Sequence, residues 1–324
     1  MKIFSLVFGT IFCTIFLATP GAVFAGHADA SELKHRRVVV ISVDGLGAQL
    51  LSSLSTSEVP TFTTMARDGD QAIRAETVLK AQTVPGHASM LSGVDTSKHR
   101  STENEMTPDL KKLEVKTIFD LVKMAGLKSA AYFGKEKLRY LFDTGSIDRN
   151  VSPRVWPFND LWARWPWVVT STVTQILERD HPDFLFVHYG ITDTVGHIFE
   201  WESAPQKLAV RAVDRSVREL LHVLDSSKED YVVIMTADHG GHEGSHGHMT
   251  ADGKLEHAES DLVIPWIVYR APAAVKADGL HVKMKNPKDV VKIYDTAATA
   301  AALLGLEVPK EWYWDGVNRV ELAK

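Results

Sequence analysis

The stretch that decides the fold is Val232-Val233-Ile234-Met235-Thr236-Ala237-Asp238-His239-Gly240-Gly241. An apolar, β-branched run of this length with glycines directly behind it is typical of a central strand in a parallel sheet. Asp238 and His239 then lie at the carboxyl end of that strand, where open α/β sheets bind their ligands. Both side chains are good ligands for a divalent cation such as zinc. The stretch therefore predicts a metal position at one edge of an α/β sheet.

Two other predicted strands end in the same way. The run Arg37–Val43 leads into Asp44, and the run Phe184–Tyr189 leads into a predicted loop that holds Asp193 and His197. The carboxyl ends of parallel strands meet at one edge of the sheet. We therefore expect these side chains and those of the first stretch to share one site.

The rest of the chain predicts a single α/β domain. With 324 residues, 45% of them hydrophobic, the chain is long enough to bury a large core. Apolar residues recur at helical spacing over residues 114–127, 168–179 and 205–224, and these segments alternate with the strands. The alternation predicts a three-layer αβα sandwich with a mainly parallel sheet. The net charge of -5 argues against a nucleic-acid-binding surface.

A region around residues 135–167 looks like a small, aromatic-rich insertion in this domain. It holds four of the chain's eight tryptophans, at positions 156, 162, 165 and 167. Two explanations fit this crowding. The tryptophans form an aromatic wall for substrate, or they are the packed core of the insertion.

The N-terminus predicts a targeting segment. Lys2 precedes an apolar run, and Val23-Phe24-Ala25 is a small-residue cleavage site, so residues 1–25 are a predicted signal peptide and residues 26–324 the mature domain. We expect an exported protein, periplasmic or secreted, with an uncleaved anchor as the alternative. The only cysteine, Cys13, lies in the leader, so the mature chain has neither a disulfide nor a thiol nucleophile. No later run is apolar enough to span a bilayer.

The candidate ligands are sufficient for two metal ions. Six ligands are available, which is what two zinc ions need if each takes three and keeps one position open; they are Asp44, Asp193, His197, Asp238, His239 and one further histidine. Paired metals suit an in-line displacement at phosphorus. Thr83 is the candidate nucleophile, because it follows a predicted strand and precedes Pro85, which is tolerated in a first helical turn. The alternative for Thr83 is a helix cap and nothing more.

Taken together and in order, these motifs resemble the alkaline phosphatase superfamily. The motifs are Asp44-Gly45, Thr83-x-Pro-x-His87, Asp193-x-x-x-Gly196-His197 and Asp238-His239-Gly240. The likeness is greatest to the type I phosphodiesterase and nucleotide pyrophosphatase branch and its compact bacterial members, and it runs from about Val38 to Gly305.

The resemblance implies a role for each matching residue. Asp44, Thr83, Asp238 and His239 would surround one Zn²⁺, while Asp193, His197 and a third histidine would hold the other. Thr83 would attack phosphorus and form a phosphothreonine. Asn104 would bind a phosphoryl oxygen, and the Val84 N–H at the helix start would give a second such bond.

The third histidine is predicted to be His246. A His-Gly pair follows Asp-His-Gly at this distance in compact members of the superfamily, and the intervening glycines allow the loop to fold back over the strand ends. His242 is too close to His239 in sequence. His248, His257 and His281 remain alternatives.

The expected substrate is a small phosphate ester or a nucleotide. Gly86 stands where nucleotide pyrophosphatases usually have asparagine, which leaves the nucleotide open. We expect diesters to be preferred, because no arginine is evident near Thr83 or Asn104; Lys80, one short turn away, is a tentative substrate-binding residue that weakens this argument. The alternatives are a broad-specificity alkaline phosphomonoesterase and a non-catalytic, zinc-stabilised binding module of the cell envelope.

Overall fold

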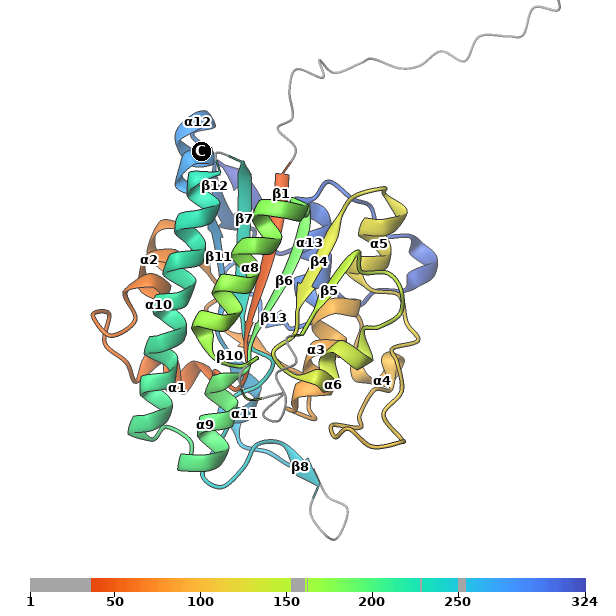
Figure 1. Ribbon diagram of the computed structural model, residues 1–324, viewed down its shortest axis with the longest axis vertical. Coiled ribbons are helices and arrows are strands. Elements are labelled where there is room, and N and C mark those ends of the chain that lie inside the picture. Colours follow the sequence, from red (N-terminus) through yellow and green to blue (C-terminus); the bar gives the residue numbers. More distant parts are fainter. Residues whose placement is uncertain (1–35, 153–160, 162, 228, 250–254) are drawn as a thin grey trace, which may run out of the picture. The chain divides into compact units, whose positions relative to one another are not determined.

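A seven-stranded sheet organises the chain (Figure 1). Its strands, in spatial order, are β2 (Asp70–Gln71), β11 (Trp266–Arg270), β7 (Asp230–Thr236), β1 (Arg36–Val43), β6 (Phe184–Tyr189), β4 (Ser129–Tyr132) and β5 (Arg149–Val151). From β7 to β5 the strands are parallel; β11 is antiparallel to β7, and β2 to β11. All residues of β6 and β7 are buried, as expected of strands covered on both faces.

The computed structural model describes residues 36–152, 161, 163–227, 229–249 and 255–324. The predicted signal peptide lies outside these residues, as do Trp156 and Trp162. Trp165 and Trp167 are 42% and 58% exposed, so these two do not form a packed core. In the same region β5 pairs with β4 and extends the main sheet.

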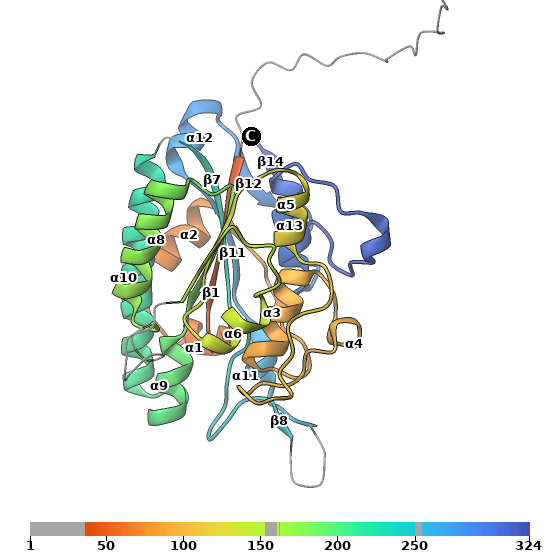
Figure 2. The same cartoon turned by 45° about the vertical axis from the view of Figure 1, so that its right-hand side comes forward.

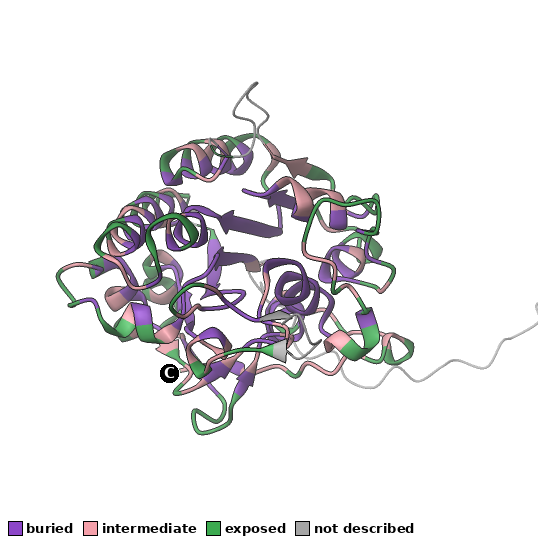
Figure 3. Ribbon diagram, turned by 90° about the horizontal axis from the view of Figure 1, so that it is seen from below, coloured by how far each residue is buried: buried purple, intermediate pink, exposed green. Residues whose placement is uncertain are grey.

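Helices cover both faces of the sheet (Figure 2). One layer contains α2 (Pro60–Asp68), α8 (Pro166–Asp180) and α10 (Ala204–Ser226), and the other contains α3 (Thr83–Ser92), α5 (Ile118–Met124) and α13 (Asp295–Leu303). The helix α10 buries one apolar stripe, which includes Val213, Val217 and Leu220. Viewed along the strands, the sheet is buried between the outer helices (Figure 3). This arrangement confirms the predicted three-layer αβα sandwich.

Pro265 marks the point where one predicted strand divides between two sheets. The apolar run over residues 262–269 alone predicts a single strand. In the structure β10 (Val263–Ile264) joins a second sheet with β3 (Ala75–Glu76) and β13 (Val291–Lys292), while β11 joins the main sheet. Proline has no N–H to donate to a ladder, so the pairing breaks there.

The remaining elements are short. They are α1 (Ala48–Ser52), α4 (Thr96–His99), α6 (Glu136–Leu141), α9 (Ile191–Phe199), α11 (Glu259–Leu262), α12 (Pro272–Asp278), η1 (Lys310–Trp312), β8 (His248–Met249), β9 (Leu255–Glu256), β12 (His281–Met284) and β14 (Val320–Ala323). Among the described residues no helix combines the length and the apolar character that a membrane crossing needs.

Candidate active site

The predicted metal ligands converge at one edge of the sheet. Asp44 follows β1, and Asp238 and His239 follow β7. Asp193 and His197 follow β6, but the expectation of a loop there is wrong, because they lie on α9 and are four residues apart on one helix face. Gly196 lets α9 pack closely on its neighbours, because an added Cβ would lie 2.6 Å from Gln206 Nε2 and 3.2 Å from the Trp201 indole ring.

Thr83 is the first residue of α3 and is only 1% exposed. The N-cap is Gln82, and the Thr83 hydroxyl accepts a hydrogen bond from Lys135 Nζ at 3.1 Å, so the hydroxyl does not cap the helix. Gly86 brings α3 against the end of β7, since a Cβ there would lie 2.7 Å from the backbone oxygen of Asp238. The close approach of helix and strand places the hydroxyl beside the carboxylates.

Asp44, Asp238 and His239 form one group of potential metal ligands. His239 Nε2 lies 3.5 Å from Asp44 Oδ1 and 3.4 Å from Asp238 Oδ2. His239 Nδ1 lies 2.8 Å from the Gly240 carbonyl, to which it donates, so Nε2 carries the lone pair. All three side chains are fully buried.

A second group lies around Asp193. Asp193 Oδ1 is 3.3 Å from His197 Nε2, 3.7 Å from His246 Nε2 and 3.8 Å from His239 Nε2. His246 Nδ1 donates to the Ala81 carbonyl at 2.8 Å, which leaves Nε2 directed at the group. Burial, followed by the neighbouring His239, lowers the pKa of His246 to about 2, so its ring is neutral, as a metal ligand must be.

The structure thus places His246 in the predicted position of the third histidine. The described side chains of the alternatives lie elsewhere. His242 Nδ1 is bonded to Asp261 at 2.8 Å, His257 is exposed, and His281 lies on β12. Of His248, the structure gives only the backbone position on β8. The ligand role of His246 itself stays a prediction.

Unpaired buried atoms show that these residues fit bound cations. Asp44 Oδ1, Asp193 Oδ1, Asp238 Oδ2 and His239 Nε2 are buried and have no hydrogen-bond partner among the described residues. Burying carboxylate oxygens without a partner is costly. Burial, followed by the charge of Asp44, also raises the pKa of Asp238 well above its usual range. Oxygen and imidazole nitrogen donors in this arrangement suit a divalent cation such as zinc.

Lys135 is a member of the site that the sequence analysis missed. Its Nζ lies 2.7 Å from Asp44 Oδ2 and 2.6 Å from Asp193 Oδ2, so each carboxylate uses Oδ2 for the lysine and leaves Oδ1 unpaired. Burial alone would lower the pKa of Lys135, but the charges of Asp193 and Asp44 outweigh burial and raise it above its ordinary value. Lys135 is therefore a fixed cation beside Thr83. Lys135 lies three residues after the end of β4, so the strand-end rule used for Asp44 would have found it.

Two further buried side chains hold the ligands in place. The Gly134 N–H donates to His188 Nδ1 at 3.1 Å, so His188 carries its proton on Nε2 and donates to Asp44 Oδ2 at 2.8 Å. Trp201 packs edge-on against His197 and His246, with ring centroids 5.6 Å apart in both pairs. Gly241 leaves room for this indole, because a Cβ there would lie 2.1 Å from it.

The predicted substrate-binding residues lie in two different places. Asn104 lies beside Thr83, and its Oδ1 accepts a hydrogen bond from the Val84 N–H at 3.0 Å. That N–H was expected to bind a phosphoryl oxygen, and instead it orients the Asn104 amide. Lys80 Nζ donates to the Thr102 carbonyl at 2.5 Å, and Lys80 does not line the cavity that holds Thr83.

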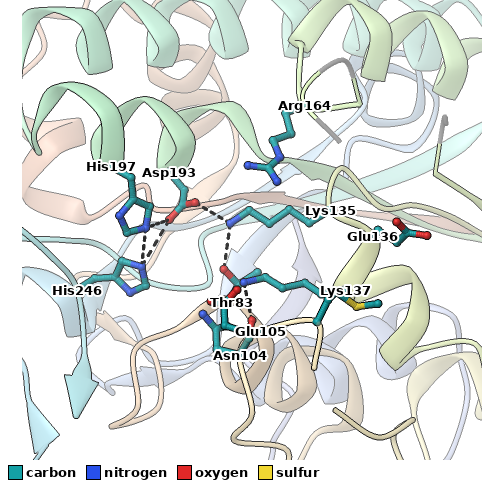
Figure 4. Close-up of a pocket in the computed structure, with 11 residues that line it drawn as sticks. Thr83, Asn104, Glu105, Lys135, Glu136, Lys137, Arg164, Asp193, His197 and His246 are labelled. Atoms are coloured by element: carbon teal, nitrogen blue, oxygen red, sulfur yellow. Dashed lines mark hydrogen bonds and ion pairs between the residues drawn. The ribbon is translucent and has the colours of Figure 1, made fainter. Parts of the chain in front are cut away.

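That cavity has a volume of about 410 Å³ (Figure 4). Its lining combines the Thr83 hydroxyl, predicted metal ligands and three cationic side chains, and consists of Thr83, Asn104, Glu105, Met106, Lys135, Glu136, Lys137, Arg164, Asp193, His197 and His246. Figure 4 shows Asp193, His197 and His246 on one side, and Thr83 with Asn104 and Lys137 on another. A substrate bound here would contact the hydroxyl and the cation-binding groups together.

Comparison with known proteins shows relatives in sequence and in fold. A 2,3-bisphosphoglycerate-independent phosphoglycerate mutase of Campylobacter jejuni (strain RM1221) is 27% identical over 160 residues, which are 49% of this chain and 29% of the mutase. The chain thus matches less than a third of that curated relative. A putative sulfatase from Bacteroides thetaiotaomicron VPI-5482 has a TM-score of 0.67 at 16% identity, over 88% of this chain and 74% of that structure. For a 2-O GAG sulfatase the TM-score is 0.63 at 15% identity, over 87% and 73%.

The chain shares the αβα sandwich of these structures, and in this chain the sandwich carries carboxylates and imidazoles at the strand ends. A model of the type I phosphodiesterase / nucleotide pyrophosphatase family matches residues 38–321. The chain belongs to that family.

Proposed function

We propose that this protein is an exported phosphoric ester hydrolase that uses Thr83 as nucleophile and two divalent cations, zinc by preference. One observation supports it above all. The Thr83 hydroxyl lines the same cavity as Asp193, His197 and His246, three of the candidate ligands. Four ligand atoms of the two groups, Asp44 Oδ1, Asp193 Oδ1, Asp238 Oδ2 and His239 Nε2, are buried and have no hydrogen-bond partner among the described residues. A binding module without activity would have no need of a hydroxyl at that position.

The reaction has two displacements. The Thr83 oxygen attacks phosphorus, the bond to the ester oxygen breaks, and the threonine carries the phosphoryl group. Water then attacks the phosphothreonine and frees the hydroxyl. Two in-line displacements give net retention of configuration at phosphorus.

The chain's own side chains prepare Thr83 and hold the phosphoryl group. Lys135 stays protonated and donates to the Thr83 oxygen, so it favours the ionised form of that hydroxyl. Asn104 uses Oδ1 for the Val84 N–H, and its Nδ2 remains to donate to a phosphoryl oxygen.

The cations would be held by the two ligand groups. Asp44, Asp238, His239 and Thr83 would hold one, and Asp193, His197 and His246 the other. When bound, they supply Lewis-acid stabilisation of charge on the attacking and leaving oxygens. Histidine and carboxylate ligands favour zinc over magnesium, which prefers oxygen alone.

The test is hydrolysis by purified protein after removal of metal and after addition of zinc. We expect zinc-dependent release of nitrophenol from 4-nitrophenyl phosphate, from bis(4-nitrophenyl) phosphate, or from both. Two inactive substrates at saturating zinc would refute the proposal. N-terminal sequencing of the protein recovered outside the cytoplasm tests export, with Gly26 as the expected first residue.

A further inference from the structure

Two further cations, Lys137 and Arg164, line the cavity beside Thr83. Both come from the region between β4 and α8, and both are half-buried. Arg164 Nη1 donates to Thr194 Oγ1 on α9 at 2.7 Å. Lys137 Nζ donates to the backbone carbonyl of Asn104 at 2.8 Å. The expectation that no arginine lies near Thr83 or Asn104 is therefore wrong, because Arg164 lines the same cavity as both residues.

Lys137 differs from Lys135 in how its charge is balanced. Lys135 contacts two carboxylates, whereas no carboxylate of the described residues lies within ion-pair distance of Lys137 Nζ. Burial, followed by the charge of Lys135, lowers the pKa of Lys137 to about 8, so Lys137 is still a cation at neutral pH. A half-buried ammonium with no counter-ion is unfavourable until an anion binds. The cavity beside Asn104 is the place where such an anion would enter.

We infer that the phosphoryl group this site prefers is a dianion, so that its substrates are phosphomonoesters rather than diesters. This inference rests on the proposed function. A diester carries one negative charge and a second ester group, while a monoester carries about two charges and a third free oxygen. Asn104 contributes a neutral donor to the phosphoryl oxygens. Lys137 Nζ lies against the backbone carbonyl of Asn104. It would donate a charge-assisted hydrogen bond to the additional anionic oxygen, which a monoester has and a diester lacks.

The test compares two esters that share one leaving group. Initial rates on 4-nitrophenyl phosphate and on methyl 4-nitrophenyl phosphate are measured at pH 7 with zinc, for wild type, Lys137→Met and Lys137→Arg. We expect wild type to favour the monoester in kcat/KM by tenfold or more. Lys137→Met should reduce that ratio at least tenfold with little loss on the diester, and Lys137→Arg should keep most of it. Lys276→Met, an exposed lysine on α12, is the matched control and should leave the ratio unchanged.

Binding provides a readout that is independent of turnover. In calorimetric titration of zinc-loaded protein, inorganic phosphate should bind at least tenfold more weakly to Lys137→Met than to wild type, and dimethyl phosphate equally to both. A wild-type preference for the diester, or a phosphate affinity that Lys137→Met leaves intact, overturns the inference. Failure of the proposed function looks different, because wild type would then cleave neither ester, whatever its affinity for phosphate.

Discussion

The role of Thr83 as nucleophile can be tested separately from metal binding. Its hydroxyl contacts Lys135, while Asp44, Asp238 and His239 lie together without needing it. Thr83→Ala should therefore lower kcat by about 10³-fold or more, because the nucleophile is gone. Its zinc content should remain near that of wild type. Thr83→Ser should recover part of the turnover, since serine restores the oxygen. Wild-type turnover in the alanine variant, measured with metal content by atomic absorption, would rule out the covalent mechanism.

Replacing His246 tests whether its imidazole is a metal ligand in the second group. The ring is held by the Ala81 carbonyl and by stacking on His239, with centroids 4.0 Å apart. His246→Ala removes one ligand near Asp193, and we expect it to lose about one zinc per chain and most of its activity. His257→Ala, at an exposed position, is the control and should keep both. Should His246→Ala retain full zinc and activity while another histidine variant loses them, the assignment fails.

At the scale of elements, the sequence predicted which residues end the strands. It did not predict the conformation and contacts of the segments that surround those residues. The apolar runs before Asp44 and Asp238 are buried strands, as predicted. The helical conformation of Asp193 and His197 was missed, because glycine in the segment disfavours a helix and the close packing of Gly196 on Gln206 and Trp201 is visible only in the fold. Lys135 was missed because its neighbours were assigned to an insertion. In addition, Lys135 pairs with Asp44 and Asp193, which are far from it in the sequence, so no local pattern indicates the contact.

The contact between α3 and the end of β7 leads to a prediction about Gly86. This residue is buried, and a Cβ would lie 2.7 Å from the Asp238 backbone oxygen and 3.1 Å from its Cβ. Gly86→Ala should push the start of α3 away from Asp238, with a loss of stability of about 1–3 kcal/mol typical of overpacking. We expect activity to fall more than stability accounts for, since Thr83 moves with the helix.

Chemical denaturation and steady-state kinetics on Gly86→Ala provide the measurement. Gly126→Ala is not a suitable comparison, because Gly126 has a φ of +73° and alanine would be strained there. Ala88→Gly, on the same helix, is the comparison. It changes the helix propensity of α3 without adding a Cβ, so it shows the effect of propensity in the absence of a clash with β7. Full activity in Gly86→Ala would show that α3 need not approach β7 so closely.

At the scale of the whole molecule, the site exists only when distant segments have folded together. Its residues run from Asp44 to His246 and come from the ends of β1 and β7, from α3 and α9, and from the loops after β4 and β7. The sequence predicted the layers, but not the strand order β7-β1-β6-β4, because periodicity shows that a strand is buried and not which strand lies beside it. Folding therefore brings three carboxylates together, and Lys135 is the cation that two of them, Asp44 and Asp193, contact.

This concentration of charge predicts how the protein responds to removal of metal. Without bound cations, Asp44 Oδ1, Asp193 Oδ1 and Asp238 Oδ2 are buried without partners, so zinc should stabilise the folded state strongly. At a free concentration of 100 times Kd, each site adds about 2.7 kcal/mol to the free energy of unfolding. Chelation should accordingly lower Tm by roughly 5 °C or more, and zinc should restore it. Differential scanning calorimetry at neutral pH measures both.

Asp238→Asn is the matched variant for this experiment. Asp238 Oδ1 accepts hydrogen bonds from the Gly45 and His239 N–H groups, which an asparagine oxygen can also accept. The variant thus keeps those bonds while it removes one ligand oxygen and a carboxyl group whose ionised form is disfavoured by burial and by Asp44. We expect its metal-free form to melt above the metal-free wild type, and its gain on adding zinc to be smaller. If the metal-free wild type melts at the same temperature as the zinc-loaded form, the buried carboxylates are balanced by Lys135 alone, and they are not a cation site.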